Sequence, residues 1–282
     1  MHGGGFLRIL QSKIAKLEKH GASLIQPLKP ASHTSLPVAR RGISCFVCPL
    51  RIRPAFEPKA EDEIAFINGL KIDHRPIASG SDIIHAGQDD AELFTLFSGW
   101  AFRYKSLEDG RRQILNFILP GDLIGLQAAL LSAAEYSVEA LTDVEVCVFS
   151  RKRIWTIFEN RPQLAYNISW LGARDEGFLD DNLTSVGQRT ARERIAALVL
   201  GLYRRANHLG LVRDNTFLFP LTRQHIADAL GLSLVHTIKT WSTLRKAGLF
   251  SFKAGHLTLL NPRLTEATAK FYDREWRQRP II

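Results

Sequence analysis

Residues 221–249 contain the residue types that read double-stranded DNA, at a spacing that places them on one short helix. Thr222 and Ser233 are candidate helix caps, and Gly231 between them suits a tight interhelical corner because glycine readily adopts a positive φ. A helix beginning after Ser233 fits the major groove, where its exposed side chains reach base edges. The base-facing candidates are Ser233, Leu234, Val235, His236 and Lys239.

Phosphate contacts are expected from the segment before the corner and from the hairpin after it. Thr222, Arg223 and Gln224 begin the first helix of the pair, and Lys253 lies in a predicted hairpin over residues 249–260 that would serve as a wing. The alternative is a helical hairpin without a ligand. The corner glycine, the two caps and the wing together favour a winged helix-turn-helix.

The charge distribution agrees with a DNA-binding end. The 282 residues carry 37 Lys+Arg and 28 Asp+Glu, and the net charge is +7 over residues 1–57, −8 over 58–187 and +10 over 188–282. A basic end beside an acidic middle is typical of a nucleic-acid-binding domain joined to a non-binding one. A basic surface kept for solubility is the alternative.

The composition excludes several classes of protein. Hydrophobic residues make up 45% and charged residues 23%, which is ordinary for a globular chain. No apolar run is long enough to cross a bilayer, so we expect no membrane partner. Three cysteines cannot build a disulfide framework, and we therefore expect a reducing compartment, the cytoplasm.

The remaining pattern predicts an α+β fold in four parts. Residues 1–58 are predicted to be an N-terminal extension, flexible and with a short amphipathic helix over 6–17. Residues 59–152 alternate in short segments, as in a double-sheet β-barrel or jelly roll. Residues 153–187 form a long helix, and 188–282 the DNA-binding domain. The helix has an apolar stripe that we expect a second copy of the chain to cover, packing on its own barrel being the alternative: Leu164, Ile168, Leu171, Phe178 and Leu179.

Three stretches carry a resemblance to a known family. They are residues 96–100 (Leu-Phe-Ser-Gly-Trp), 118–125 (Ile-Leu-Pro-Gly-Asp-Leu-Ile-Gly) and 221–233 (Leu-Thr-Arg-Gln-His-Ile-Ala-Asp-Ala-Leu-Gly-Leu-Ser). With the order of parts, they resemble the Crp/Fnr family of bacterial transcription regulators over residues 59–262. The resemblance implies a cyclic-nucleotide-type sensor barrel, a dimerisation helix and homodimers on near-palindromic promoter sites, with RNA polymerase as a further partner.

Two family positions differ on the predicted reading helix. Many members have a glutamate where this chain has Val235 and an arginine where it has Lys239. Valine accepts no hydrogen bond, and lysine is a point charge instead of a planar fork. We therefore expect a half-site that differs from the family's common ones.

The expected sensor pocket also departs from the family. Members that respond to cyclic AMP carry Gly-Glu and Arg-Ser or Arg-Thr pairs, whereas this chain has Gly125-Leu126 and Tyr136-Ser137. A buried phosphate without a cation is costly. We therefore predict no control by cyclic AMP, with Leu126, Tyr136 and Ser137 as pocket residues.

The cysteines are redox candidates. The oxygen-sensing branch of the family holds an iron–sulfur cluster on four cysteines, and Cys45, Cys48 and Cys147 match three of these positions. No cofactor is expected, and three hypotheses remain open: no redox role, a reversible disulfide, or a cluster whose fourth iron position has a non-cysteine ligand or stays open.

An enzyme is disfavoured. A metal-binding cupin barrel needs clustered histidines, but His74 and His85 are isolated, and neither a nucleophile elbow nor a phosphate-binding loop occurs. We predict no catalytic residues and no metal site. A regulator controlled only by its abundance is the alternative to a ligand-gated sensor.

Overall fold

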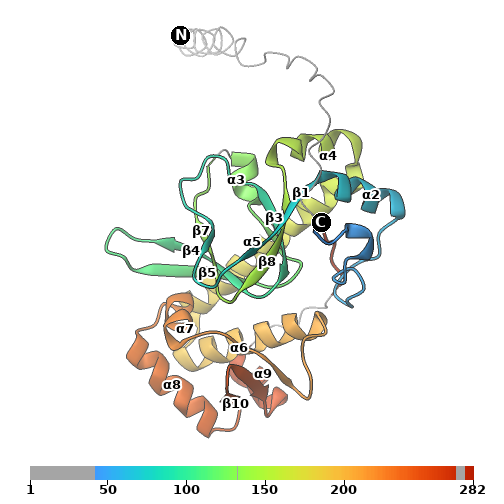
Figure 1. The fold of residues 1–282 in the computed structure, drawn as a ribbon. Helices are drawn as coiled ribbons and strands as arrows, with labels where there is room; N and C mark the ends of the chain where they lie inside the picture. Colours follow the sequence, from blue (N-terminus) through green and yellow to red (C-terminus); the bar gives the residue numbers. More distant parts are fainter. Residues whose placement is uncertain (1–41, 132, 271–276) are drawn as a thin grey trace, which may run out of the picture. The chain divides into compact units, whose positions relative to one another are not determined.

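The first half of the chain forms two packed β-sheets, as predicted. The computed structural model describes residues 42–131, 133–270 and 277–282. The sheets have the strand orders β1-β8-β3-β6 and β2-β7-β4-β5, and neighbouring strands are antiparallel (Figure 1). The strands are β1 (Lys71–Ile77), β2 (Asp82–Ile84), β3 (Leu93–Ser98), β4 (Ala101–Ser106), β5 (Arg112–Ile118), β6 (Leu123–Ile124), β7 (Ser137–Ala140) and β8 (Val144–Phe149).

Alternation of side chains fills the space between the sheets. Val144, Val146 and Val148 of β8 are all buried, because successive β residues point to opposite faces and these three share one. The turn before β4 needs glycine: Gly99 has φ +82°, and a Cβ there would lie 2.4 Å from the Asp143 carbonyl oxygen.

Helices cover the barrel. They are η1 (Cys45–Val47), α2 (Glu61–Leu70), α3 (Leu126–Leu131), α4 (Ile154–Asn160) and α5 (Pro162–Gln188). The predicted helix over 153–187 is thus divided at Arg161, and Pro162 occupies the first turn of α5, where its missing N–H costs nothing. None of the helices in the described ranges is long and apolar enough to cross a membrane.

The apolar stripe of α5 is covered by the chain itself. Leu164, Ile168 and Leu171 are 1–4% exposed, and the first two belong to a core cluster with Leu93 and Phe149 of the barrel. The expectation that a second copy covers this stripe is therefore wrong for these residues, because the barrel edge and α4 already exclude water from them.

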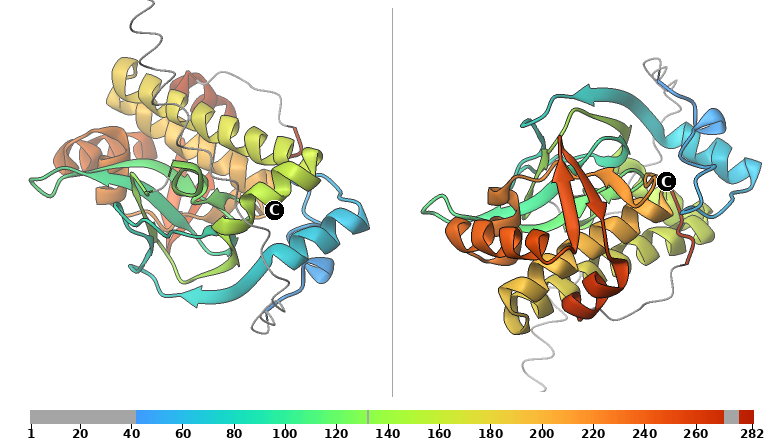
Figure 2. Two further views of the ribbon diagram at one scale, coloured as in Figure 1. Left: turned by 90° about the horizontal axis from the view of Figure 1, so that it is seen from above. Right: turned by 90° about the horizontal axis from the view of Figure 1, so that it is seen from below.

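The C-terminal domain is a winged helix-turn-helix. Its elements are α6 (Ala191–His208), β9 (Thr216–Leu218), α7 (Arg223–Leu230), α8 (Leu234–Lys246), β10 (Phe250–Lys253), β11 (His256–Leu259) and α9 (Pro262–Ala269). Helix α6 runs back alongside α5 (Figure 2). The core of the domain is aromatic: the Trp241 and Phe250 rings lie 4.5 Å apart, and Phe217 packs edge-on against Phe219.

Two boundaries differ from the sequence-based expectation. Within the predicted extension 1–58, three residues belong to the core: Leu50, Ala55 and Phe56. Phe56 is 2% exposed and lies over Gly121, where a Cβ would meet its ring at 2.1 Å. The amphipathic helix predicted over 6–17 lies outside the described residues. At the other end, the Arg279 backbone bridges to Phe56 and its guanidinium donates to the carbonyls of Pro120 and Gly121, so the last residues also pack on the first half of the chain.

Candidate nucleic-acid interface and sensor pocket

The helix-turn-helix corner is built by local hydrogen bonds. The Thr222 hydroxyl accepts from the His225 N–H at 3.1 Å, and His225 Nδ1 accepts from the Thr222 N–H at 3.2 Å. Gly231 ends α7 with φ 62°, and the Ser233 hydroxyl accepts from the His236 N–H at 3.2 Å to begin α8. Both caps and the left-handed corner thus lie where the sequence predicted them.

Helix α8 has one buried and one open face. Thr237, Trp241 and Leu244 are 0–2% exposed and hold the helix on the domain core. The opposite face contains every predicted base-facing residue, all of them exposed: Ser233, Leu234, Val235, His236 and Lys239. Ile238, 49% exposed on the same face, was not among these candidates, although its spacing from Val235 places it there.

Two predicted phosphate contacts already have partners within the domain. The Arg223 guanidinium lies 3.9 Å from the Trp241 ring centroid, and burial, followed by the nearby Arg245, lowers its pKa to about 10. Gln224 donates to Asp228 over 2.6 Å. Thr222 and Lys253 are exposed at the start of α7 and at the end of the first wing strand.

The first helix of the motif is docked on the barrel. The described residues all belong to one compact unit of the chain, in which Gln113 of β5 donates to the Ala229 carbonyl over 3.0 Å. The His225 ring lies 5.4 Å from the Phe102 ring of β4. Burial and the neighbouring Arg112 lower the pKa of His225. The outer face of this sheet and the DNA-binding domain therefore share one apolar core.

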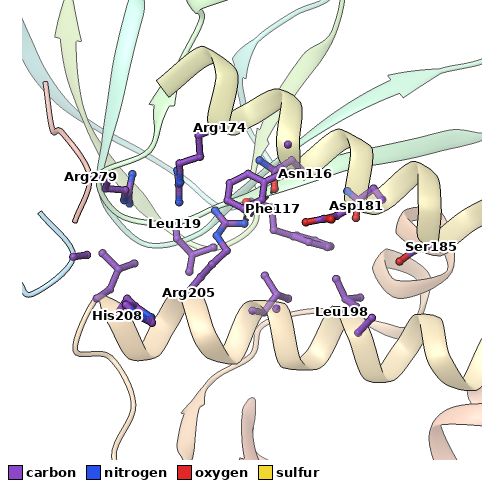
Figure 3. A pocket seen from close by; sticks show the side chains of 18 of the residues that line it. Asn116, Phe117, Leu119, Arg174, Asp181, Ser185, Leu198, Arg205, His208 and Arg279 are labelled. Carbon is purple, nitrogen blue, oxygen red and sulfur yellow. Dashed lines mark hydrogen bonds between the residues drawn. The ribbon is translucent and has the colours of Figure 1, made fainter. Parts of the chain in front are cut away.

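A buried charge cluster joins the barrel, α5, α6 and the C-terminal residues. Asp122 lies 2.6 Å from Arg205, 2.9 Å from Arg279 and 3.2 Å from Arg174. The three arginines line a cavity of about 580 Å³ (Figure 3). Burial would raise the pKa of Asp122, but the three guanidiniums hold it well below its ordinary value. Burial disfavours the charged form of Arg279 as well, and this lowers the pKa of its guanidinium to about 9. The sequence did not reveal this cluster.

A second cavity lies inside the barrel, with a volume of about 330 Å³. Leu126 and Tyr136 line it, as predicted, but Ser137 does not; its hydroxyl accepts from the Ala86 N–H at 3.0 Å. The lining also contains Arg103 of β4, whose guanidinium lies 4.9 Å from the Tyr136 ring centroid.

Family models match both halves of the chain. Residues 74–161 match a cyclic nucleotide-binding domain, and residues 193–264 match a Crp-like helix-turn-helix domain. The nitrogen fixation regulation protein FixK of Bradyrhizobium diazoefficiens is 34% identical over 192 residues, which cover 68% of this chain and 80% of FixK. The chain belongs to the Crp/Fnr family of transcription regulators.

Two further comparisons agree with this membership. The transcriptional activator protein FnrL of Cereibacter sphaeroides is 30% identical over 212 residues, 74% of this chain and 84% of FnrL. The structure of FixK2 from Bradyrhizobium japonicum superposes with a TM-score of 0.63 at 26% identity, covering 69% of this chain and 96% of that one. The Crp/Fnr family consists of transcription regulators and not of enzymes.

The pocket of this regulator contains a cation, but at a different sequence position from the arginine of cyclic-AMP-responding Crp/Fnr members. The sequence predicted a pocket without a cation, since Tyr136 replaces the family's arginine. That premise is wrong, because Arg103 enters the cavity from a strand 33 positions earlier. The sequence did indicate this position, because side chains alternate along a strand and Arg103 therefore shares a face with the fully buried Ala101.

The three cysteines of this Crp/Fnr regulator lie near one another, around a lysine. Cys147 Sγ is 3.6 Å from His74 Nδ1, and the Lys71 ammonium donates to the same nitrogen over 3.2 Å. The charge of Lys71 lowers the pKa of Cys45, and the nearby Cys147 and Cys48 raise it. Burial raises the pKa of Cys45 to about 11 and also raises that of Cys147, so both are protonated at neutral pH.

This arrangement does not fit an iron–sulfur cluster. A cluster of the family's kind has four cysteine ligands, and this chain has three cysteines. Across residues 42–131, 133–270 and 277–282, no three Cys, His, Asp or Glu side chains are grouped to hold a metal ion.

Proposed function

We propose that this Crp/Fnr regulator binds near-palindromic promoter sites as a homodimer in the cytoplasm, contacts RNA polymerase there and is not controlled by cyclic AMP. The observation that carries the proposal is the division of α8: one face is fixed on the domain core, and the other presents Leu234, Val235 and Lys239 to solvent. Only such a free face can enter a major groove without unfolding the domain.

The exposed side of α5 supports a second copy as partner. With the apolar stripe covered by the barrel, a different row remains open, and its members repeat every three or four residues, as in a coiled-coil seam. Tyr166 is 63% and Leu183 74% exposed. The row is Tyr166, Ser169, Ala173, Glu176, Asp180 and Leu183.

One experiment tests DNA recognition and another tests assembly. Selection of binding sites from random DNA by the purified protein should give two half-sites in inverted order; a single half-site or no enrichment would contradict the proposal. In sedimentation analysis the wild type should be dimeric, Leu183→Glu monomeric, and the control Ile52→Glu, at an 88% exposed position, dimeric.

The absence of control by cyclic AMP depends on Leu126. An apolar side chain at this wall of the cavity offers no acceptor to a ribose hydroxyl, even though Arg103 supplies a cation. Calorimetry should therefore show no micromolar binding of cyclic AMP, and DNA affinity should be unchanged by the nucleotide.

Redox control is a second candidate, which the similarity to FixK and FnrL and the gathering of the three cysteines favour. In this hypothesis two thiols form a disulfide, and hydrogen peroxide accepts the two electrons and two protons to give two waters. Mass spectrometry after peroxide treatment should find a loss of two hydrogens, absent from Cys147→Ser if Cys147 takes part. Unchanged DNA affinity in oxidised and reduced protein would exclude redox control.

A further inference from the structure

The barrel cavity contains two buried polar groups without a partner. Both Nε and Nη2 of Arg103 are buried and lack a hydrogen-bond acceptor among the described residues. The buried Gln127 Oε1 likewise lacks a hydrogen-bond donor there. Both side chains line the same cavity of about 330 Å³. A buried guanidinium without an acceptor is costly, so the two Arg103 nitrogens indicate a missing anionic group.

The unpartnered atoms of Arg103 have a specific shape. Nε and Nη2 form one edge of the planar guanidinium, from which two parallel N–H groups point the same way. A carboxylate accepts both at once, through its two oxygens. The Arg103 guanidinium lies over the Tyr136 ring, 4.9 Å from its centroid, and interacts with the Tyr136 hydroxyl, while Nε and Nη2 remain without a hydrogen-bond partner.

The charges around the cavity favour a single negative charge. Of the carboxylates that line it, Asp122 is already surrounded by Arg174, Arg205 and Arg279. Burial, the largest influence, and the nearby Asp122 raise the pKa of Asp175. Glu176 is exposed on α5. The charge of Arg103 lowers the pKa of Asp175 against these influences, but among the described residues no ion pair or hydrogen bond joins Arg103 to a carboxylate.

The rest of the wall determines the body of the ligand. Its side chains are mostly aliphatic, and the volume is near the lower end of the range for small-molecule sites, roughly 300–1,000 Å³. Such a wall favours a compact apolar group over a ribose. The aliphatic lining residues are Ile118, Ile124, Leu126, Leu130, Val138 and Leu179.

We propose that this cavity binds a small monocarboxylate with an apolar aromatic or branched body, held by a bidentate pair with Arg103. Its body would contact α5 at Gly172 and Leu179, next to the exposed row proposed as the dimer seam. The binding itself is independent of DNA, whereas a regulatory effect rests on the proposed function.

Isothermal titration calorimetry of the full chain with benzoate, phenylacetate and 3-methylbutanoate tests the proposal without DNA. At least one should bind saturably, and Arg103→Gln should weaken that affinity roughly 10- to 100-fold, the range for a lost charged hydrogen bond. Arg103→Lys should restore part of it. The control Arg111→Gln, at the exposed tip of the same hairpin, should bind like the wild type.

Two further arms distinguish the outcomes. Benzyl alcohol has no charge, so its affinity should be equal in wild type and Arg103→Gln; loss of both ligands in the variant would indicate a collapsed cavity and not a carboxylate contact. No saturable binding of any of the three carboxylates would overturn the proposal. So would tighter binding of cyclic AMP that depends on Arg103, since the anion would then be a phosphate. None of these results depends on whether the chain binds DNA.

Discussion

Arg112 of β5 donates from Nε to Asp228 Oδ2 of α7 over 2.8 Å, with the two side chains only 26% and 11% exposed. The pair joins the sensor barrel to the first helix of the DNA-binding motif across 116 positions of sequence. Arg112 also reaches Glu139 of β7 at 3.3 Å. The pair therefore gives the barrel sheet a direct contact with the helix that precedes α8.

A double-mutant cycle measures this connection. Arg112→Ala, Asp228→Ala and the double variant should show a coupling of roughly 0.5–3 kcal/mol in urea unfolding, because a largely buried pair is little screened by water. The exposed pair Arg111–Asp109 is the control and should couple by ~0–1 kcal/mol. Equal coupling in the two cycles would mean that the domain contact does not depend on Arg112.

Removal of the Asp122 charge should be among the most destabilising single changes in the chain. Asp122→Asn leaves three guanidiniums facing one another without an anion, and we expect a loss of ~3–5 kcal/mol at neutral pH. The control Asp109→Asn removes an exposed carboxylate and should change stability by ~0.5 kcal/mol or less. Chemical denaturation with fluorescence detection gives both values.

The same variant predicts a pH dependence. The folded-state pKa of Asp122 lies below its ordinary 3.8, so its stabilising contribution is complete above that pH and is lost as the pH falls toward the folded-state value. The gap in stability between wild type and Asp122→Asn should therefore be constant from pH 7 to about pH 5, begin to narrow below about pH 4 and go on narrowing as the pH falls toward the folded-state pKa. A gap that does not narrow at all between about pH 4 and about pH 2 would contradict the assignment.

His225 should make stability sensitive to mild acid. Its pKa is lowered from 6.5, so the folded state favours the neutral ring, and stability should be complete above pH 6.5 and fall as the pH drops below it. Protonation would also remove the Nδ1 acceptor that caps Thr222. His225→Gln keeps an acceptor in the form of an ordinary capping box and should flatten this dependence, whereas His256→Gln, in the exposed wing, should not. Thermal unfolding from pH 7.5 to 5.5 provides the comparison.

The sequence predicted what local interactions determine. Thr222, Gly231 and Ser233 act within three residues of themselves, so their types and spacing were sufficient to place both helices of the motif. The strand alternation of the barrel was recognised for the same reason, since each strand carries its own period.

The sequence did not predict contacts between distant segments. Asp122 and Arg279 are separated by 157 positions, and no period or spacing connects them. The apolar stripe of α5 had two suitable covers, a second copy or its own barrel, and Leu164 and Ile168 look alike in either. Arg103 was overlooked because the search for a cation was confined to the family's own position, although the strand alternation indicated an inward side chain.

Lys239 tests the reading face. It is exposed on α8 and should contact a base edge, so Lys239→Ala should weaken binding to the selected site by ~1–3 kcal/mol and binding to random DNA much less. Arg223→Ala, by contrast, should weaken both kinds of DNA alike if it contacts phosphate. It also removes the guanidinium stacked at 3.9 Å on Trp241, so its thermal stability must be measured in parallel. Fluorescence anisotropy at one salt concentration, with the selected and a scrambled duplex, gives the affinity of each variant relative to wild type on each duplex. Equal losses on both duplexes for Lys239→Ala would remove this lysine from the base-reading set and leave it as a phosphate contact.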